Sequence, residues 1–455
     1  MRELVIDGNS LNIRDVVDTG LGLTKVVLSQ SAREKMIISR EAITEILNNK
    51  TVTYGINTGF GALSSVSIES DKLEQLQANL IRSHACGIGD PMENSHTLMM
   101  MLIRANTLCR GNSGARPILV DTLISMINNG VCPVIPRIGS LGASGDLAPL
   151  SHLALGMMGE GNCNIRIDLN NWETTSSDLA LKRNGIEPLV PAAKEGLSLI
   201  NGTSQMCAFM CEALYNLDIL CFASDASAAC TVEAIKGSHM PFDPRIHASR
   251  PHPGQNTSAA RISSLLNNSE IKLSHVNCDK VQDAYSIRCS PQVHGPVIDM
   301  LRESRRILEI EINSSTDNPL VFIEGDKIEV ISGGNFHGQY IALSSDSISI
   351  ACHELASISE RRINQILDPK WSGHSAFLAN DEGLESGLMI IQYSSAAVLA
   401  ELHLLSNSAT TSNTPVSMGK EDHASMGATG AHRTMIATRL LANVISNEII
   451  CASEA

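Results

Sequence analysis

Long apolar stretches with helical periodicity constrain the fold of this chain more than any other feature of its sequence. The longest, residues 195–236, is rich in Ala, Cys and Met and apolar on most faces, which is typical of a helix buried among other helices. Further helices are predicted over residues 287–313, 386–406 and 423–450 and in the segment that follows Gly338. Such helices favour a bundle that continues across subunits, so we expect a mainly α protein that forms a homo-oligomer.

The first part of the chain has a more mixed pattern. Short β-like segments at residues 4–6, 25–28 and 52–54 accompany a helix predicted over residues 31–47. Gly, Pro and Asn then separate four helical segments, at residues 70–83, 95–108, 115–127 and 147–158, and a small hairpin is predicted at residues 320–331. We expect a small mixed α/β N-terminal region over residues 1–195, followed by a long-helix bundle over residues 196–455.

Charge and composition exclude several classes of partner. The chain has 48 Asp and Glu against 34 Lys and Arg, a formal net charge of −14, and no run of five or six basic residues. Aromatic residues make up only 3% of it, so we expect neither a nucleic acid nor a membrane as partner. The first residues lack the basic and apolar regions of a signal peptide, and no apolar stretch approaches the length that spans a bilayer. The twelve cysteines show neither disulfide nor metal-site spacing, which indicates a cytoplasmic protein without a metal.

The most unusual short segment is Ala143-Ser144-Gly145, within the Gly-rich residues 139–150. One interpretation is a turn that leads into a helix, with Ser144 or Asp146 as the N-cap. The spacing excludes a G-x-S-x-G nucleophile elbow and a phosphate-binding loop. Another interpretation is chemical: in a tight bend, the Gly145 nitrogen can attack the Ala143 carbonyl carbon, since both residues are small. Loss of two water molecules then leaves a methylidene group, a strong electrophile made without an external cofactor.

This segment resembles the prosthetic-group motif of the aromatic amino acid ammonia-lyases, whose Ala-Ser-Gly forms 4-methylideneimidazole-5-one (MIO). Other segments resemble the family's motifs in the same order. They are residues 53–61, 79–84, 199–203, 282–288, 311–319, 333–337 and 421–423. The resemblance implies a long-helix bundle of the aromatic amino acid lyase and fumarase-like type, and a homotetramer whose sites are shared between chains. Members of the family usually continue beyond the position of Ala455, so the C-terminal helices are expected to be short or missing.

The resemblance also implies the residues that carry out the elimination. The methylidene carbon from Ser144 would take the amino group, and Tyr54 would take the β-proton of the substrate. An ordinary phenol has a pKa of about 10, so this role requires surroundings that stabilise the phenolate. Arg288 offers a planar fork for the substrate carboxylate, and Tyr285, three residues earlier, would face the same side of a helical turn.

Five further residues are expected around the substrate. His84 and Glu421 would hold an imidazole, because Ser83-His84 and Glu421 resemble the members that act on L-histidine. Asn201 and Gln282 would donate hydrogen bonds around the MIO and the carboxylate, and Phe336 would pack on the MIO ring or its loop. Asn201 can also be interpreted as a helix cap. Lys420 and residues 401–403 depart from the histidine-acting members.

Three other functions stay open at this point. An MIO-dependent 2,3-aminomutase has the same residues and returns ammonia to the β-carbon. A tyrosine or phenylalanine ammonia-lyase is disfavoured by Ser83-His84. An inactive helical scaffold is disfavoured because the residues expected to carry out the chemistry are all present.

Overall fold

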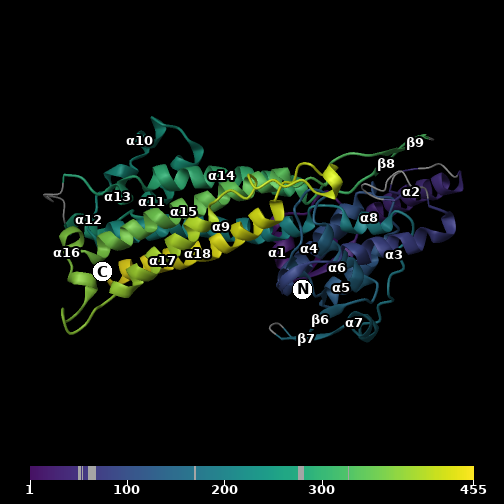
Figure 1. Cartoon of the computed structure of the whole chain (residues 1–455). Helices are drawn as coiled ribbons and strands as arrows, with labels where there is room; N and C mark the ends of the chain where they lie inside the picture. The colour runs from purple at the N-terminus through teal and green to yellow at the C-terminus, as the bar shows by residue number, and fades with distance from the viewer. Residues whose placement is uncertain (50–52, 54, 60–67, 169–170, 275–280, 326) are drawn as a thin grey trace. The chain divides into compact units, whose positions relative to one another are not determined.

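The computed structural model describes residues 1–49, 53, 55–59, 68–168, 171–274, 281–325 and 327–455 (Figure 1). The chain forms two compact units. Unit 1 comprises residues 1–212, 306–343 and 409–432, and unit 2 comprises residues 213–305, 344–408 and 433–455. Four of the boundaries fall inside long helices. The predicted boundary at residue 195, between an N-terminal region and a long-helix bundle, stays a prediction.

Unit 1 contains small sheets among short helices, as the mixed pattern predicts. Strands β1 (Arg2–Ile6) and β2 (Thr24–Leu28) pair in parallel, joined through α1 (Ile13–Gly20), where Asn12 and Asp15 form a reciprocal capping box. The other helices are α2 (Gln30–Asn48), α3 (Leu73–His84), α4 (Asn94–Cys109), α5 (Pro117–Asn128), α6 (Leu147–Met157), α7 (Ser177–Arg183) and α8 (Glu195–Ile200), with a 3₁₀ turn η2 at Ser70–Lys72. The predicted segment at residues 52–54 lies largely outside the described residues.

Helix α4 is the core of unit 1. Every residue from His96 to Cys109 is buried, and the helix packs against α1 and α5. A helix that is buried on all faces must pair its own polar side chains. Asn106 does so: its Oδ1 accepts from the Gly8 amide at 2.9 Å, and its Nδ2 donates to the Ile312 carbonyl at 2.9 Å. These bonds join segments that lie far apart in the chain.

The remaining strands of unit 1 are short and antiparallel. The predicted hairpin is confirmed, with β8 (Leu320–Glu324) paired to β9 (Lys327–Ile331). Five further strands were not predicted: β3 (Ile88–Pro91), β4 (Val131–Pro133), β5 (Pro136–Ile138), β6 (Asn162–Arg166) and β7 (Trp172–Ser176). Three of these have four residues or fewer, too few for a period of two to be recognised.

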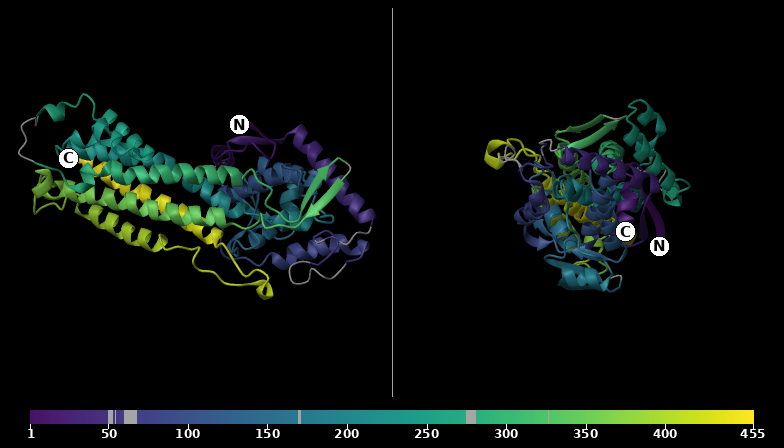
Figure 2. Two further views of the ribbon diagram at one scale, coloured as in Figure 1. Left: turned by 90° about the horizontal axis from the view of Figure 1, so that it is seen from above. Right: turned by 90° about the vertical axis from the view of Figure 1, so that its right-hand side faces the viewer.

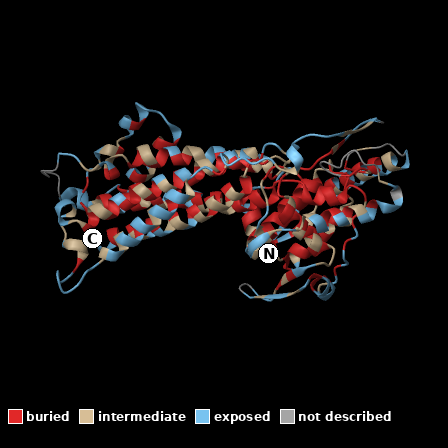
Figure 3. Cartoon of the chain, viewed as in Figure 1, coloured by how far each residue is buried: buried red, intermediate tan, exposed pale blue. Residues whose placement is uncertain are grey.

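Unit 2 is helical. Its elements include η3 (Met240–Phe242), α10 (Pro244–Ala248), α11 (Pro253–Leu265), α12 (Glu270–Ser274), α13 (Tyr285–Arg288), α16 (Pro369–Ser372), η4 (Ala376–Leu378) and α17 (Met389–Leu405). Long helices contribute to it as well: α9 (Ser204–Ala234), α14 (Ser290–Glu311), α15 (Gln339–Leu367) and α18 (Gly427–Glu454), while η5 (Ser417–Gly419) belongs to unit 1. In Figures 1 and 2 the long helices run side by side, and Figure 3 shows that their facing sides carry most of the buried residues. The mainly α fold with long helices is therefore confirmed.

The predicted helix over residues 195–236 is interrupted. Helix α8 ends at Ile200 and α9 begins at Ser204, because Asn201 has an extended backbone and Gly202 a φ of +150°. An added Cβ at Gly202 would lie 2.3 Å from Nη1 of Arg104, so only glycine fits there. The break places Asn201 in a turn between two helices.

Two helices contain longer apolar stretches than the sequence analysis expected. Helices α9 and α18 are long and apolar enough to cross a bilayer, so the expectation that no stretch approaches that length was wrong. In the most apolar window of each helix, 56% and 50% of the residues are buried inside the chain. Core helices of a bundle have the same composition and the same burial.

Candidate active site

The Ala143-Ser144-Gly145 segment forms a tight bend before α6. Gly142 and Gly145 have φ values of +68° and +74°, in the region that favours glycine. An added Cβ at Gly145 would lie 2.3 Å from the carbonyl oxygen of Gly202, and one at Gly142 would lie 2.2 Å from Oγ of Ser425. Both glycines are therefore required by backbone conformation and by close contact with other segments.

Hydrogen bonds to its backbone hold this bend against three segments of unit 1. The Asp146 amide donates to the Gly202 carbonyl at 2.7 Å, beside the break between α8 and α9. Oγ of Ser425 donates to the Gly142 carbonyl at 2.9 Å, and the Gly338 amide donates to the same oxygen at 3.3 Å. The bend is thus fixed by residues far along the chain, from Gly202 to Ser425.

Asp146 is a residue whose function the sequence analysis missed. It occupies the N-cap position of α6, but its side chain makes no cap bond there. Its Oδ2 accepts instead from the amides of Gln205 and Met206, at 2.8 and 3.1 Å, in the first turn of α9. Its Oδ1 accepts from Oγ of Ser140 at 2.7 Å. Complete burial raises the pKa of Asp146 to about 6, while these hydrogen bonds and the Arg104 guanidinium act in the opposite direction.

Asn201 contacts the bend directly. Its Nδ2 donates to the carbonyl oxygen of Ser144 at 2.6 Å. Its own carbonyl accepts from Nη1 of Arg104 at 2.7 Å, and Arg104 is fully buried in α4. Asn201 also occupies the C-cap position of α8, as the helix-cap interpretation predicts, whereas its role beside MIO and the substrate stays a prediction. No sequence pattern predicted that Arg104 would be buried beside the bend, since an arginine in a helix is usually exposed.

His84 is the last residue of α3 and is half-buried. Its Nδ1 lies 2.9 Å from the Leu80 carbonyl oxygen and 3.0 Å from Oγ of Ser83. A proton on Nδ1 would satisfy the Leu80 carbonyl and make Nε2 a hydrogen-bond acceptor. Ser83 therefore orients the ring, which gives a physical role to the Ser83-His84 pair.

Phe336 and Glu421 are half-buried and lie in segments that contact the bend. Phe336 precedes Gly338, whose amide reaches Gly142, and the Met426 amide donates to the Leu141 carbonyl at 2.8 Å. The backbone of Glu421 pairs with that of Val416 in an antiparallel bridge. The bend, His84, Asn201, Phe336 and Glu421 all belong to unit 1, whereas Tyr54 lies outside the described residues.

Gln282, Tyr285 and Arg288 belong to unit 2. Helix α13 is a single turn with Tyr285 and Arg288 at its ends, and the guanidinium carbon lies 4.5 Å from the centroid of the phenol ring. Gln282 and Arg288 line one pocket of about 750 Å³. Nε of Arg288 is buried and has no hydrogen-bond partner among the described residues, so the guanidinium keeps an unused donor beside the pocket.

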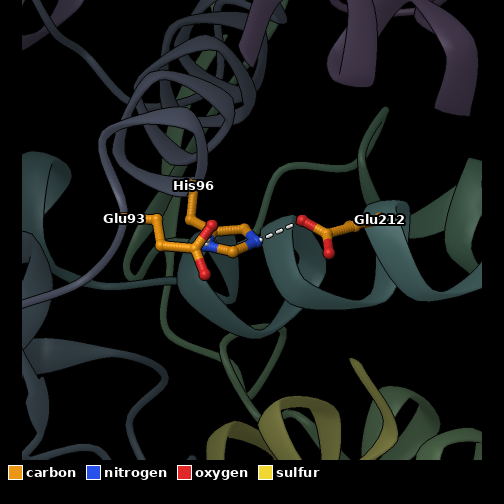
Figure 4. A group of neighbouring side chains, drawn as sticks. All are labelled: Glu93, His96 and Glu212. Carbon is orange, nitrogen blue, oxygen red and sulfur yellow. Dashed lines mark hydrogen bonds and ion pairs between the residues drawn. The ribbon is translucent and has the colours of Figure 1, made fainter. Parts of the chain in front are cut away.

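A separate cluster in unit 1 contains Glu93, His96 and Glu212 (Figure 4). Among the described residues it is the one such group whose potential metal-ligand atoms lie within 4.8 Å of one another. Nε2 of His96 lies 2.7 Å from Oε2 of Glu212, and Nδ1 lies 4.0 Å from Oε2 of Glu93. The carboxylates thus face different ring nitrogens, which is the arrangement of a hydrogen-bonded buried histidine rather than of a site with convergent ligands.

The family model for aromatic amino acid lyases matches residues 11–455. The chain belongs to the aromatic amino acid lyase family. It is 44% identical over 452 residues to histidine ammonia-lyase of Myxococcus xanthus (strain DK1622), covering 99% of this chain and 88% of that protein.

Solved structures agree on the family fold. Histidine ammonia-lyase from Trypanosoma cruzi superposes with a TM-score of 0.92 at 39% identity, covering 100% of this chain and 84% of that one. Tyrosine aminomutase from Streptomyces globisporus superposes with a TM-score of 0.90 at 34% identity, covering 99% of this chain and 88% of that one. The membership of this family that the motifs predicted is therefore confirmed.

Proposed function

We propose that this chain is a carbon–nitrogen lyase that converts L-histidine into trans-urocanate and ammonia, the first step of histidine degradation. The observation that carries the proposal is the Ala143-Ser144-Gly145 bend, whose central carbonyl accepts from Asn201 at 2.6 Å. The identity of 44% to a histidine ammonia-lyase, over nearly the whole chain, supports the choice of substrate. A 2,3-aminomutase is the second candidate, since a tyrosine aminomutase superposes at 34% identity.

The bend fits formation of MIO from its own three residues. Ala143 and Gly145 have the smallest side chains, which allows the Gly145 nitrogen to approach the Ala143 carbonyl carbon, and the positive φ of Gly145 gives the chain a bend that other residues rarely adopt. MIO supplies an electrophilic carbon to the amino group of the substrate. The carbonyl oxygen of Ser144 is retained when the ring closes, so Nδ2 of Asn201 would stabilise negative charge on it.

The other residues would bind and orient the amino acid. Arg288 would hold the carboxylate with its free Nε, and the Tyr285 ring would keep the guanidinium in place. His84 and Glu421 would hold the two nitrogens of the imidazole, with Glu421 accepting from the ring nitrogen that carries the proton. Tyr54 would remove the β-proton.

Gln282 would add a hydrogen bond at the carboxylate, beside Arg288 in the same pocket. Phe336 would pack against the ring formed by the bend.

We further propose a cytoplasmic homotetramer with shared sites. Helix α17 is strongly apolar, yet only Ser395 and Leu402 are buried in it, and Ile390 and Tyr393 are each 62% exposed. An exposed apolar helix of this length is typical of a surface covered by a second copy. None of the eleven described cysteines forms a disulfide, in agreement with a reducing compartment.

The test is to add L-histidine to the purified protein and to follow near-ultraviolet absorbance together with ammonia release. Urocanate is conjugated and absorbs there, whereas histidine and β-histidine do not. Both signals should appear in the unchanged protein and disappear in Ser144→Ala. Loss of two water molecules in the intact mass, with neither signal, would favour the aminomutase or another amino acid.

Sharing of the site has its own test. A Tyr54→Phe chain mixed with a Ser144→Ala chain should regain part of the activity, because some sites would receive both intact residues. Mixed tetramers that stay inactive at every ratio would show that sites are not shared.

A further inference from the structure

Unit 2 contains a buried ion pair that the proposed chemistry does not use. Arg362 in α15 and Glu448 in α18 are both fully buried. The guanidinium donates through Nε to Oε1 at 2.5 Å and through Nη2 to Oε2 at 2.8 Å. Hydroxyl groups of Ser359 and Thr231 donate to the same carboxylate, at 2.6 and 2.7 Å. The pair is therefore bidentate, and its carboxylate has additional donors.

The third nitrogen of Arg362 points away from Glu448 toward α13. Nη1 lies 3.4 Å from the carbonyl oxygen of Ser286, 3.4 Å from Oγ of Ser290 and 3.3 Å from Nε2 of His294. Burial lowers the pKa of His294, and a neutral ring that donates from Nδ1 to Asp225, at 2.9 Å, presents Nε2 as an acceptor. All three groups around Nη1 can thus accept hydrogen bonds.

Ser286 lies between Tyr285 and Arg288 in the single turn of α13. A helix of four residues has no stability of its own, so its position must come from contacts with neighbouring helices. Oγ of Ser290 donates to the carbonyl oxygens of Ser286 and Ile287, at 3.1 and 3.0 Å. Arg362 contacts both Ser286 and Ser290, which connects this turn to α15.

A contribution to stability alone explains this arrangement poorly. Removal of two charges from water costs several kcal/mol for each ion, and well-packed apolar residues often stabilise a core as much as a buried ion pair does. What apolar residues cannot provide is a donor at the Ser286 carbonyl, or a fixed orientation of the turn.

We infer that Arg362 is a positioning residue for Arg288: through the Ser286 carbonyl it holds the α13 turn so that the Arg288 guanidinium faces the substrate carboxylate. The inference rests on the proposed role of Arg288. Arg362 itself touches neither substrate nor MIO.

The test compares two inhibitors that differ only in the carboxylate, imidazole-4-propionate and 4-propylimidazole. Arg362→Lys keeps the charge opposite Glu448 and removes the planar fork. It should weaken imidazole-4-propionate about 10-fold, the effect of one charge-assisted hydrogen bond, and change 4-propylimidazole less than about twofold. The matched control is Thr231→Val, which removes a donor from Glu448 but leaves Arg362 and Ser286 in contact. It should leave the ratio of the two inhibition constants unchanged.

Arg288→Lys is measured in parallel, so that the inference and the proposed function can fail separately. If Arg288→Lys does not change the ratio, the carboxylate role of Arg288 is wrong and the inference falls with it. If Arg288→Lys lowers the selectivity but a folded Arg362→Lys does not, only the positioning role of Arg362 is overturned. If Arg362→Lys does not fold, the double variant Arg362→Gln/Glu448→Gln decides, because it removes the guanidinium donor at the Ser286 carbonyl without leaving an unpaired buried charge. A ratio unchanged in this folded double variant would then overturn the inference.

Discussion

Replacement of Asp146 by asparagine tests how the Ala143-Ser144-Gly145 bend is held. A carboxyl group whose pKa is higher in the folded than in the unfolded chain binds its proton more tightly when folded. Its contribution to stability is complete below the ordinary pKa of 3.8 and is lost as the pH rises through about 6. A shift of this size corresponds to about 3 kcal/mol, since each pKa unit is worth about 1.4 kcal/mol.

Asparagine has the same shape but does not titrate in this range. Its oxygen can accept from the amides of Gln205 and Met206, and its amide group can donate to Ser140, whose hydroxyl accepts as well as donates. We therefore expect wild type to lose stability relative to Asp146→Asn, by about 3 kcal/mol, between about pH 4 and about pH 7.5. At about pH 7.5, Asp146→Asn should be at least as stable as wild type.

The assay is urea unfolding followed by far-ultraviolet circular dichroism, at several pH values and one protomer concentration, because an oligomer's stability depends on concentration. Asp121→Asn, which removes a carboxylate from a half-exposed pair with Arg33, is the control for a general effect of charge. The reasoning is refuted if wild type gains stability over Asp146→Asn as the pH rises. That result would mean that the ionised carboxylate is favoured by the amides at the start of α9 more than burial disfavours it.

Three further substitutions have expected outcomes. Gly145→Ala should abolish the loss of two water molecules in the intact mass, because a left-handed φ costs about 1–2 kcal/mol and the added carbon would meet the Gly202 carbonyl oxygen at 2.3 Å; normal dehydration would contradict this. Asn201→Ala should lower kcat by about 10²–10³ with an unchanged circular dichroism spectrum, as loss of a donor to a developing oxyanion does, and a change in KM alone would exclude that role. Lys194→Met should cost about 3–5 kcal/mol in thermal or urea unfolding, since Asp317 is fully buried and 3.0 Å from the lysine; the control Lys194→Met/Asp317→Leu should recover most of the loss.

Most helices of ten residues or more were predicted from the sequence because periodicity identifies them, although the 13-residue α11 was missed. Residues 95–108, 115–127 and 147–158 correspond to α4, α5 and α6 within two residues at each end. The break at residues 201–203 was not predictable in the same way, since apolar residues continue on both sides of it. It depends on the close approach of the Arg104 guanidinium to Gly202, which is a tertiary contact.

The candidate site likewise contains residues that could be predicted from the sequence and residues that could not. Its exposed or half-buried residues, such as His84 and Arg288, were named from motifs because their chemistry is specific. The residues that hold them in place were not named. Asp146 was interpreted as a cap of the helix that follows it, but its carboxylate caps α9 instead. A capping partner 59 residues away leaves no local pattern in the sequence.

These supporting residues share a physical role that explains their burial. Several of the residues proposed for the chemistry lie on short turns, which have little stability of their own, and each of these turns is hydrogen-bonded to a longer or more buried element. Arg104 of α4 holds the Asn201 carbonyl, Asp146 joins the bend to α9, and Arg362 of α15 reaches the α13 turn. An apolar side chain could fill the same space, but it could not accept or donate the hydrogen bond that sets the orientation of a backbone group. The cost of burying these groups is therefore best understood as the cost of fixing the turns that carry the residues proposed for catalysis.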